Sequence, residues 1–236
     1  RPRIVVSVDW FPPAFRAGGP IRSTFNLVSL LANTYDVWVI SGAYDLGQDR
    51  PLDVPLDTWQ TVECGAGSIQ VMHWTRSNWN SKAWTQILGE LNPDWLHLNS
   101  VFSKHFTLIP LRAARKRDNL RIVLAPRGML GSAALSLKPL KKRLFLSYAR
   151  ATGLFRNMRW HASTAMERDE VLGQFMNADC RVAQNIPGGS ILEGSPRDTE
   201  NWNVVSVGRI HRVKNLHFGL EALLNAPSSR PIKMTF

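Results

Sequence analysis

Short apolar runs alternate along the chain with segments whose apolar residues recur at helical spacing. The runs are near-continuous in Val, Ile and Leu, which is typical of strands that are buried on both faces. They predict strands at residues 3–8, 36–41, 69–74, 95–98, 121–125, 159–162 and 181–184. The segments between them predict helices at residues 20–32, 81–91, 103–116, 138–151 and 164–175. Strands that alternate with helices favour an α/β fold, with a parallel sheet covered on both faces.

Other segments interrupt this pattern. Residues 42–60 are rich in Pro and Asp and predict a long loop, and Pro110 breaks or kinks the helix that contains it. Residues 185–201 carry Pro, Gly and charges without periodicity, and we interpret them as an interdomain linker. A strand, a helix and a strand then follow at residues 202–207, 215–224 and 232–236. We therefore expect an N-terminal Rossmann-like domain at 1–184 and, at 202–236, the first βαβ unit of a second one, truncated and too short for its own core.

Composition narrows the class of protein. The chain has 236 residues, of which 44% are hydrophobic and 20% charged, so it is long enough to bury a core without disulfides. Its two cysteines, Cys64 and Cys180, lie far apart, which indicates a reducing compartment and excludes a zinc site built on cysteine. No stretch reaches the roughly 20 apolar residues of a membrane span, and no charged leader precedes an apolar segment. We therefore expect a cytoplasmic protein.

The charge of the chain is strongly positive and unevenly spread. There are 29 Lys and Arg residues against 18 Asp and Glu residues, which gives a net charge of +11. Residues 119–166 contain no Asp or Glu at all, but they contain nine cations. Such an asymmetry implies an anionic partner, which could be phosphate, nucleic acid or lipid headgroups.

The predicted helix at 138–151 concentrates this charge. At about 100° per residue, six apolar side chains fall on one side of the helix: Leu137, Leu140, Leu144, Tyr148, Ala151 and Phe155. The other side carries cations, with Phe145 and Leu146 among them as exposed apolar groups. Cations interleaved with apolar groups suit adsorption on an anionic membrane surface, and the alternative is an ordinary Lys-rich surface helix. The residues that we expect at such a surface are Lys138, Lys141, Lys142, Arg143, Phe145 and Leu146.

The loop after the first strand ends in Gly18, Gly19 and Pro20. In an open parallel sheet, ligands bind beyond the carboxyl ends of the strands. The two glycines allow the backbone to approach a ligand closely, and the helix N-terminus that follows would favour an anion. The alternative is a turn that only reverses the chain. The loop lacks G-x-G-x-x-G and G-x-x-x-x-G-K-[ST], which argues against nicotinamide, flavin and P-loop chemistry.

The loop from Gly208 to Asn215 follows a predicted strand and opens a helix. Gly208 allows a tight exit from the strand, and Arg209 and Lys214 are spaced to converge on one point beyond it. Two cations beside a helix N-terminus would bind a diphosphate and stabilise a departing phosphate. The alternatives are a solvated basic turn and a helix that Asn215 merely caps.

Several further stretches lie in a characteristic order: Pro126-Arg-Gly-Met-Leu130 with a basic segment after it, Trp160-His-Ala-Ser-Thr followed by Glu167, and Asn185-Ile-Pro. Together with the two glycine loops and the linker, they resemble retaining GT-B glycosyltransferases of family 4 along essentially the whole chain. The resemblance implies two Rossmann-like domains that face each other across a cleft. It implies an acceptor on the N-terminal domain and a nucleotide-sugar donor on the C-terminal one, with no metal and no cofactor.

The resemblance also implies roles for individual residues. Donor-binding residues would be Gly18, Gly19, Gly208, Arg209 and Lys214, of which Gly19, Arg209 and Lys214 would also act in catalysis. Two departures from the family pattern matter. Many relatives have His where this chain has Arg127, and an arginine cannot act as a general base. The family's E-x7-E motif would lie beyond residue 236, so we expect this chain to be inactive by itself.

The residues expected to bind the acceptor follow partly from their positions in the sequence and partly from the family resemblance. The residues that we expect to bind the acceptor are Asp9, Arg16, His97, Asn99 and Arg127. Asp9 ends the first strand and would orient Arg16 or the acceptor, unless it forms a structural salt bridge. His97 either faces the cleft or is a satisfied histidine at a strand end. Glu167 has a structural explanation, because Thr164 and Glu167 form a capping-box pattern.

These observations lead to a principal hypothesis and to alternatives. The principal hypothesis is retaining transfer of a sugar from a nucleotide-sugar to a saccharide or lipid-linked acceptor, in cell-envelope polysaccharide biosynthesis, at the inner face of the cytoplasmic membrane. The net charge and nine Trp residues permit a basic nucleic-acid-binding α/β protein instead, but no nucleic-acid-binding signature is present, so nucleic acid is not expected. A Rossmann oxidoreductase would need a glycine fingerprint where this chain has Pro12-Pro13.

Overall fold

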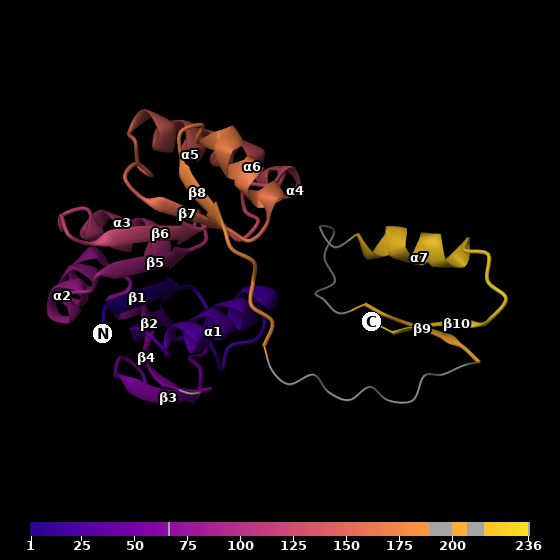
Figure 1. Ribbon diagram of the computed structural model, residues 1–236, viewed down its shortest axis with the longest axis horizontal. Helices are drawn as coiled ribbons and strands as arrows, with labels where there is room; N and C mark the ends of the chain where they lie inside the picture. The colour runs from indigo at the N-terminus through magenta and orange to yellow at the C-terminus, as the bar shows by residue number, and fades with distance from the viewer. Residues whose placement is uncertain (66, 189–199, 207–214, 236) are drawn as a thin grey trace. The chain divides into compact units, whose positions relative to one another are not determined.

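The computed structural model describes residues 1–65, 67–188, 200–206 and 215–235 (Figure 1). The chain divides into two compact units, 1–188 and 189–236, and each is described by itself. The boundary lies four residues after the predicted one at residue 184.

The first unit is built on a sheet of eight strands. In chain order these are β1 (Arg3–Val8), β2 (Asp36–Gly42), β3 (Gln60–Cys64), β4 (Gly67–Trp74), β5 (Trp95–Asn99), β6 (Arg121–Ala125), β7 (Arg159–Ala162) and β8 (Asp179–Val182). In space their order is β3-β4-β2-β1-β5-β6-β7-β8. Every neighbouring pair is parallel except β3 with β4, which is antiparallel. The predicted α/β fold with a parallel sheet is confirmed.

Six α-helices join these strands: α1 (Gly19–Leu31), α2 (Ser81–Leu91), α3 (Ile109–Ala114), α4 (Ser132–Leu135), α5 (Pro139–Ala151) and α6 (Ala165–Gln174). Apolar side chains of the strands alternate between two cores, one on each face of the sheet. In β1, Ile4, Val6 and Val8 pack with Val28 of α1, while Val5 packs with residues of α2 and α3 on the other face. Figure 1 shows α4, α5 and α6 grouped beside β7 and β8, at the opposite end of the sheet from β3.

Two elements, β3 and α4, were not predicted, and the strand predicted at 181–184 is β8 at Asp179–Val182. β3 lies at the end of the predicted loop, where Gln60–Cys64 alternate between more and less exposed positions as an edge strand does. As predicted, Pro110 interrupts the helix expected at 103–116, which consists of a π-helical turn at Lys104–Leu108 followed by α3, because Pro110 cannot donate a backbone hydrogen bond within a continuous helix. The short helix α4 was not predicted.

β8 ends the sheet on the side opposite β3. Asp179, its first residue, joins two arginines by ion pairs. Its carboxylate accepts from Arg159 Nε at 2.9 Å and from Arg181 Nε at 3.1 Å. The side chains of all three residues are exposed.

The described part of the second unit contains β9 (Trp202–Val205), α7 (Leu216–Leu224) and β10 (Ile232–Thr235). The two strands are parallel neighbours, with Val204 opposite Met234. Among the described residues, every buried apolar side chain belongs to the first unit. The second unit is thus a single βαβ unit in its described part, and its apolar side chains remain at least partly exposed.

Candidate functional site

The carboxyl ends of the parallel strands form one edge of the first unit's sheet, where ligands bind in open α/β folds. Asp9 directly follows β1, Asn99 ends β5 and Arg127 follows β6. Three of the residues predicted for the acceptor site therefore lie at, or directly after, strand ends on the same edge.

The turn at Gly18 and Gly19 connects this edge to α1. Gly18 has a φ of +75°, which L side chains rarely adopt, and Gly19 begins the helix, with Pro20 in its first turn. A Cβ atom at either glycine would meet no atom of the described residues within 4 Å. The first turn of α1 contains no acidic residue. At this turn the Gly18 N–H donates to the Phe15 carbonyl at 3.0 Å, the Ile21 N–H donates to the Gly18 carbonyl at 3.1 Å, and Pro20 has no N–H. What the helix N-terminus offers to an approaching anion is therefore chiefly the positive end of the helix dipole.

Asp45, which sequence reasoning missed, fixes the loop before this turn. Its buried carboxylate accepts hydrogen bonds from the backbone N–H groups of Phe15 at 3.0 Å, Arg16 at 3.1 Å and Leu46 at 2.7 Å. Burial raises the pKa of Asp45, but these hydrogen bonds outweigh burial, and the pKa is lowered. Arg16 is thus held by its backbone, and its side chain is exposed. The hydrogen-bond partner of Asp9 is not Arg16 but Ser103.

Arg127 is a partly buried cation that amide groups hold in place. Its Nε and Nη2 donate to Asn99 Oδ1 at 3.0 and 2.9 Å, and its Nη1 donates to Asn185 Oδ1 at 2.9 Å. Burial lowers the pKa of the guanidinium, while the charge of Glu167 raises it. None of the ion pairs in the described part of the chain involves Arg127. A desolvated cation without a carboxylate partner favours a bound anion. Three of the five N–H donors of Arg127 are used by the two asparagines and fix the plane of the guanidinium, which leaves two donors for such an anion.

The backbone at Arg127 is held in an unusual conformation from outside its own loop. Arg127 and Gly128 both have positive φ, +55° and +71°. Glu167 Oε1 accepts from the Gly128 N–H at 2.6 Å, and its Oε2 accepts from Ser163 N at 2.6 Å and Oγ at 2.8 Å. Thr164 caps α6 as predicted, because its hydroxyl accepts from the Glu167 N–H at 3.1 Å. The Glu167 carboxylate, however, binds Ser163 and the turn after β6, so Glu167 positions Arg127.

His97 is buried beside Arg127. Its Nδ1 lies 3.2 Å from Asn99 Nδ2, its ring meets His161 edge to face at 5.9 Å, and its Nε2 has no hydrogen-bond partner among the described residues. Burial holds the pKa of His97 well below its usual range, and the charges of Arg127 and His161 lower it further. The ring is therefore a neutral imidazole that is enclosed rather than exposed at the edge of the sheet.

A pocket of about 390 Å³ opens at the carboxyl ends of β1 and β2, and Asp9 lies in its lining. Asp9 Oδ1 accepts a hydrogen bond from Ser103 Oγ at 2.7 Å. Burial raises the pKa of Asp9, although the hydrogen bond from Ser103 and the neighbouring His105 act against this. A carboxyl with a raised pKa exchanges a proton with a bound hydroxyl closer to neutral pH than an exposed aspartate does.

Aromatic side chains line the same pocket. Trp79 meets Tyr44 edge to face, with 5.8 Å between ring centroids. The Arg76 guanidinium lies 4.4 Å from the Tyr44 centroid and donates to Asp49 at 2.6 Å. Sequence reasoning missed these residues, although two aromatic residues shortly after strand ends were a usable signal. Aromatic walls with a few charged groups suit an organic ligand that carries several hydroxyls.

The predicted donor residues Gly208, Arg209 and Lys214 lie outside the described residues. Asn215 is described: it precedes α7 in the capping position with a φ of +48°, but its side chain accepts no capping hydrogen bond.

Two of the residues predicted for a membrane surface are not exposed. Leu146 is only 3% exposed, and Phe145 packs edge to face against Phe102 at 5.5 Å and Phe155 at 6.3 Å. The expectation was wrong because α5 turns this side of the helix toward the core. The predicted cations are at the surface, one of them partly buried: Lys138, Lys141, Lys142 and Arg143.

The described ranges contain neither a cluster of metal ligands nor a membrane-spanning helix. No group of three or more His, Cys, Asp or Glu side chains within them is arranged to hold a metal ion. No helix within them is long and apolar enough to cross a bilayer.

No protein-family model and no curated protein sequence matches the chain. Solved structures do. Sucrose-phosphate synthase from Thermosynechococcus elongatus superposes with a TM-score of 0.60 at 13% identity, over 99% of this chain and 61% of the enzyme. Trehalose-6-phosphate synthase, analysed for glycosyl transfer with retention, superposes with a TM-score of 0.53 at 13% identity, over 98% of this chain and 62% of the enzyme.

This chain therefore spans about three fifths of the length of these two enzymes. At such low identity the likeness concerns the fold. The protein has a mostly parallel α/β fold that is similar to part of the GT-B retaining glycosyltransferases.

Proposed function

We propose that this protein is the acceptor-binding part, with the beginning of the donor-binding part, of a retaining glycosyltransferase that uses a nucleotide-sugar. The observation that carries the proposal is the cation at Arg127. It lies at the carboxyl edge of a GT-B-like sheet, is held by two asparagines, and lacks a carboxylate partner in the described part of the chain. Such a group is suited to a phosphate of the donor or to an anionic group of the acceptor.

The acceptor would occupy the pocket that contains Asp9. Its aromatic wall at Tyr44 and Trp79 offers apolar surface to a sugar ring, and Asp9 and Arg76 offer hydrogen bonds to hydroxyls. The acceptor is a saccharide, free or linked to a lipid, and an envelope polysaccharide is the product class that we favour.

The proposed reaction proceeds on one face of the donor sugar. The bond between the anomeric carbon and the phosphate oxygen breaks, and the acceptor oxygen forms the new bond on the same face. The acceptor proton passes to the leaving phosphate oxygen, so no protein base is required, and Arg127 in place of a histidine is compatible with this step. Arg209 and Lys214 would stabilise the charge of the leaving diphosphate.

A thermal-shift panel on the full chain tests the proposal. UDP, GDP and ADP, each with and without its sugar, are compared at concentrations about 100 times a trial Kd, where a specific ligand stabilises by about 2.7 kcal/mol. We expect one nucleoside diphosphate to raise Tm, and we expect Arg209→Ala/Lys214→Ala to abolish the shift.

Lys233→Ala is the matched control, because Lys233 is an exposed cation of the same unit. A flat response to all three diphosphates contradicts the proposal. Salt-sensitive retention of any oligonucleotide, without a response to diphosphates, would favour the nucleic-acid alternative.

A further inference from the structure

The outward side of α5 exposes three large apolar side chains. Because Leu146 and Ala149 face the core, the opposite side carries Leu140, Leu144 and Tyr148, each four residues after the last. They are 74%, 72% and 51% exposed. Side chains at this spacing are neighbours on a helix surface, so they form a continuous row, here called the α5 stripe. Contiguous apolar groups at a surface mark a site of interaction.

A cationic groove of about 710 Å³ lies beside the α5 stripe, between α4, α5 and the end of α6. Three cations and three hydroxyl groups line it: Lys142, Arg143, Arg150, Ser132, Ser136 and Ser147. No carboxylate is among the described residues that line it. Lys142 Nζ donates to the Ala134 carbonyl at 2.5 Å and lies 5.2 Å from the Phe102 ring centroid. Cations with adjacent hydroxyls are suited to phosphate groups.

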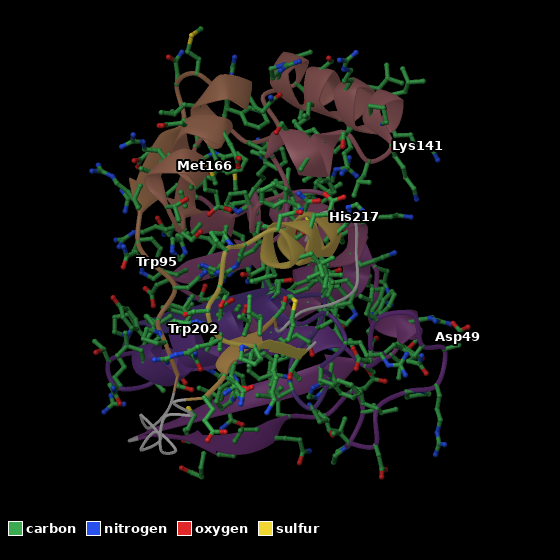
Figure 2. All side chains as sticks on the ribbon, turned by 90° about the vertical axis from the view of Figure 1, so that its right-hand side faces the viewer. Asp49, Trp95, Lys141, Met166, Trp202 and His217 are labelled. Atoms are coloured by element: carbon green, nitrogen blue, oxygen red, sulfur yellow. The ribbon has the colours of Figure 1, made fainter. Side chains whose placement is uncertain are left out.

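Further cations flank the stripe on the helix itself. Lys138 and Lys141 are exposed, and Lys141 is labelled on α5 in Figure 2. The sequence from 119 to 166 contains no acidic side chain, and Glu170 of α6 lies beside Gly131. The face of α5 is therefore apolar along its middle and positive on its margins.

We propose that the α5 stripe and the cationic groove dock this protein on an anionic phospholipid surface. Leu140 and Leu144 enter the boundary between headgroups and acyl chains, and Tyr148 lies at the headgroup level. The groove binds the lipid phosphates. Each cation close to such a surface strengthens binding by about fivefold.

The arrangement disfavours the other occupants of such a face. A two-fold pair of chains would bring the cations of one copy against those of the other, because the same patch meets itself in such a pair. A nucleic acid would neutralise the cations but would leave Leu140 and Leu144 without apolar partners. An anionic bilayer supplies both kinds of partner.

Vesicle co-sedimentation of the full chain tests the proposal. Vesicles of phosphatidylcholine alone are compared with vesicles that also contain phosphatidylglycerol. We expect binding to the mixed vesicles, weakening with added salt. Leu140→Gln/Leu144→Gln should lower the partition coefficient at least about 100-fold, because two apolar side chains no longer enter the bilayer. Lys141→Glu/Arg143→Glu should lower it at least about 25-fold.

Matched controls lie on other helices of the same unit. Leu30→Gln on α1 and Lys82→Glu on α2 replace exposed residues of the same types and should bind like the wild type. Equal binding to both vesicle types, or an unchanged partition coefficient in the stripe variant, overturns the proposal. So does concentration-dependent self-association without vesicles that the stripe variant loses, or oligonucleotide binding in place of vesicle binding. The result is independent of the glycosyl-transfer proposal, because vesicle binding requires no donor nucleotide.

Discussion

Gly18 and Gly19 are adjacent in the turn before α1, yet the backbone requires glycine at only one of them. Gly18 has a φ of +75°, whereas Gly19 is the first residue of the helix. Around both positions there is open space, so a methyl group would meet no neighbour among the described residues. The difference between them is therefore backbone strain alone.

This difference predicts the stability of two alanine variants. Gly18→Ala should lower the free energy of unfolding by about 1–3 kcal/mol, because the φ of residue 18 is unfavourable for any residue with a Cβ. Gly19→Ala should change it by at most about 0.5 kcal/mol. Urea denaturation of both variants checks this, and an equal loss in the two would contradict it.

The buried imidazole of His97 predicts a pH dependence. The unfolded chain binds a proton at His97 near pH 6.5, whereas the folded chain does not, because its pKa is lowered. The free energy of unfolding contributed by this residue is complete above pH 6.5 and is lost as the pH falls below it, with a slope of at most about 1.4 kcal/mol per pH unit.

His97→Phe removes the titrating group and keeps a ring of similar shape. Urea denaturation between pH 7.5 and 5.5 should show a shallower slope for this variant than for the wild type. The buried His73, whose pKa is also lowered by burial, is present in both proteins and cancels in the comparison. Parallel slopes would show that His97 is not enclosed as described.

At the scale of one element, α5 shows why hydrophobic periodicity alone did not orient a helix. Two apolar rows compete on it: Leu140, Leu144 and Tyr148 form one, and Phe145 with Leu146 belongs to the other. The longer row fits the helical period and was therefore expected to be the apolar side of the helix, but the shorter row faces the core. Contacts of Phe145 with the rings of Phe155 and of Phe102, which is distant in the sequence, decide the orientation.

The orientation of α5 predicts that alanine substitution of two leucines, two residues apart, changes the free energy of unfolding by very different amounts. Leu146→Ala should cost about 2–4 kcal/mol, because it leaves a cavity in the core. Leu144→Ala should stay within about 0.5 kcal/mol, because its side chain is exposed. Chemical denaturation of both variants is the measurement, and a reversed order would restore the sequence-based orientation.

For the whole molecule, the strands and the parallel sheet were predictable because Val, Ile and Leu runs report burial directly. The candidate site was predictable only where a residue follows a strand end, as Asp9 and Arg127 do. Asp45 and the contact of Glu167 with the turn after β6 escaped prediction, because their partners, the backbone amides of Phe15 and Gly128, are distant in sequence. A single sequence contains no pattern from which a hydrogen bond between a side chain and a backbone amide distant in sequence can be predicted.

The uneven distribution of buried residues predicts how the two units fold. A chain of residues 1–188 should unfold in one cooperative transition, because this unit contains all the described buried apolar side chains. Residues 189–236 alone should show no cooperative transition, because a single βαβ unit cannot bury enough apolar surface. Circular dichroism of both fragments during heating checks this. A sharp transition in the shorter fragment would contradict it.

The ion pairs at β8, an edge strand of the eight-stranded sheet, have a consequence for how the protein behaves at high concentration. A strand that ends a sheet offers its outer backbone groups to any other extended chain. Asp179, Arg159 and Arg181 surround this one with fixed charges, which a second strand would have to desolvate before pairing. Salt near 1 M shortens the reach of such charges to about 3 Å. A salt concentration near 1 M should therefore weaken the electrostatic barrier to edge-to-edge pairing of β8 strands from two copies of the protein.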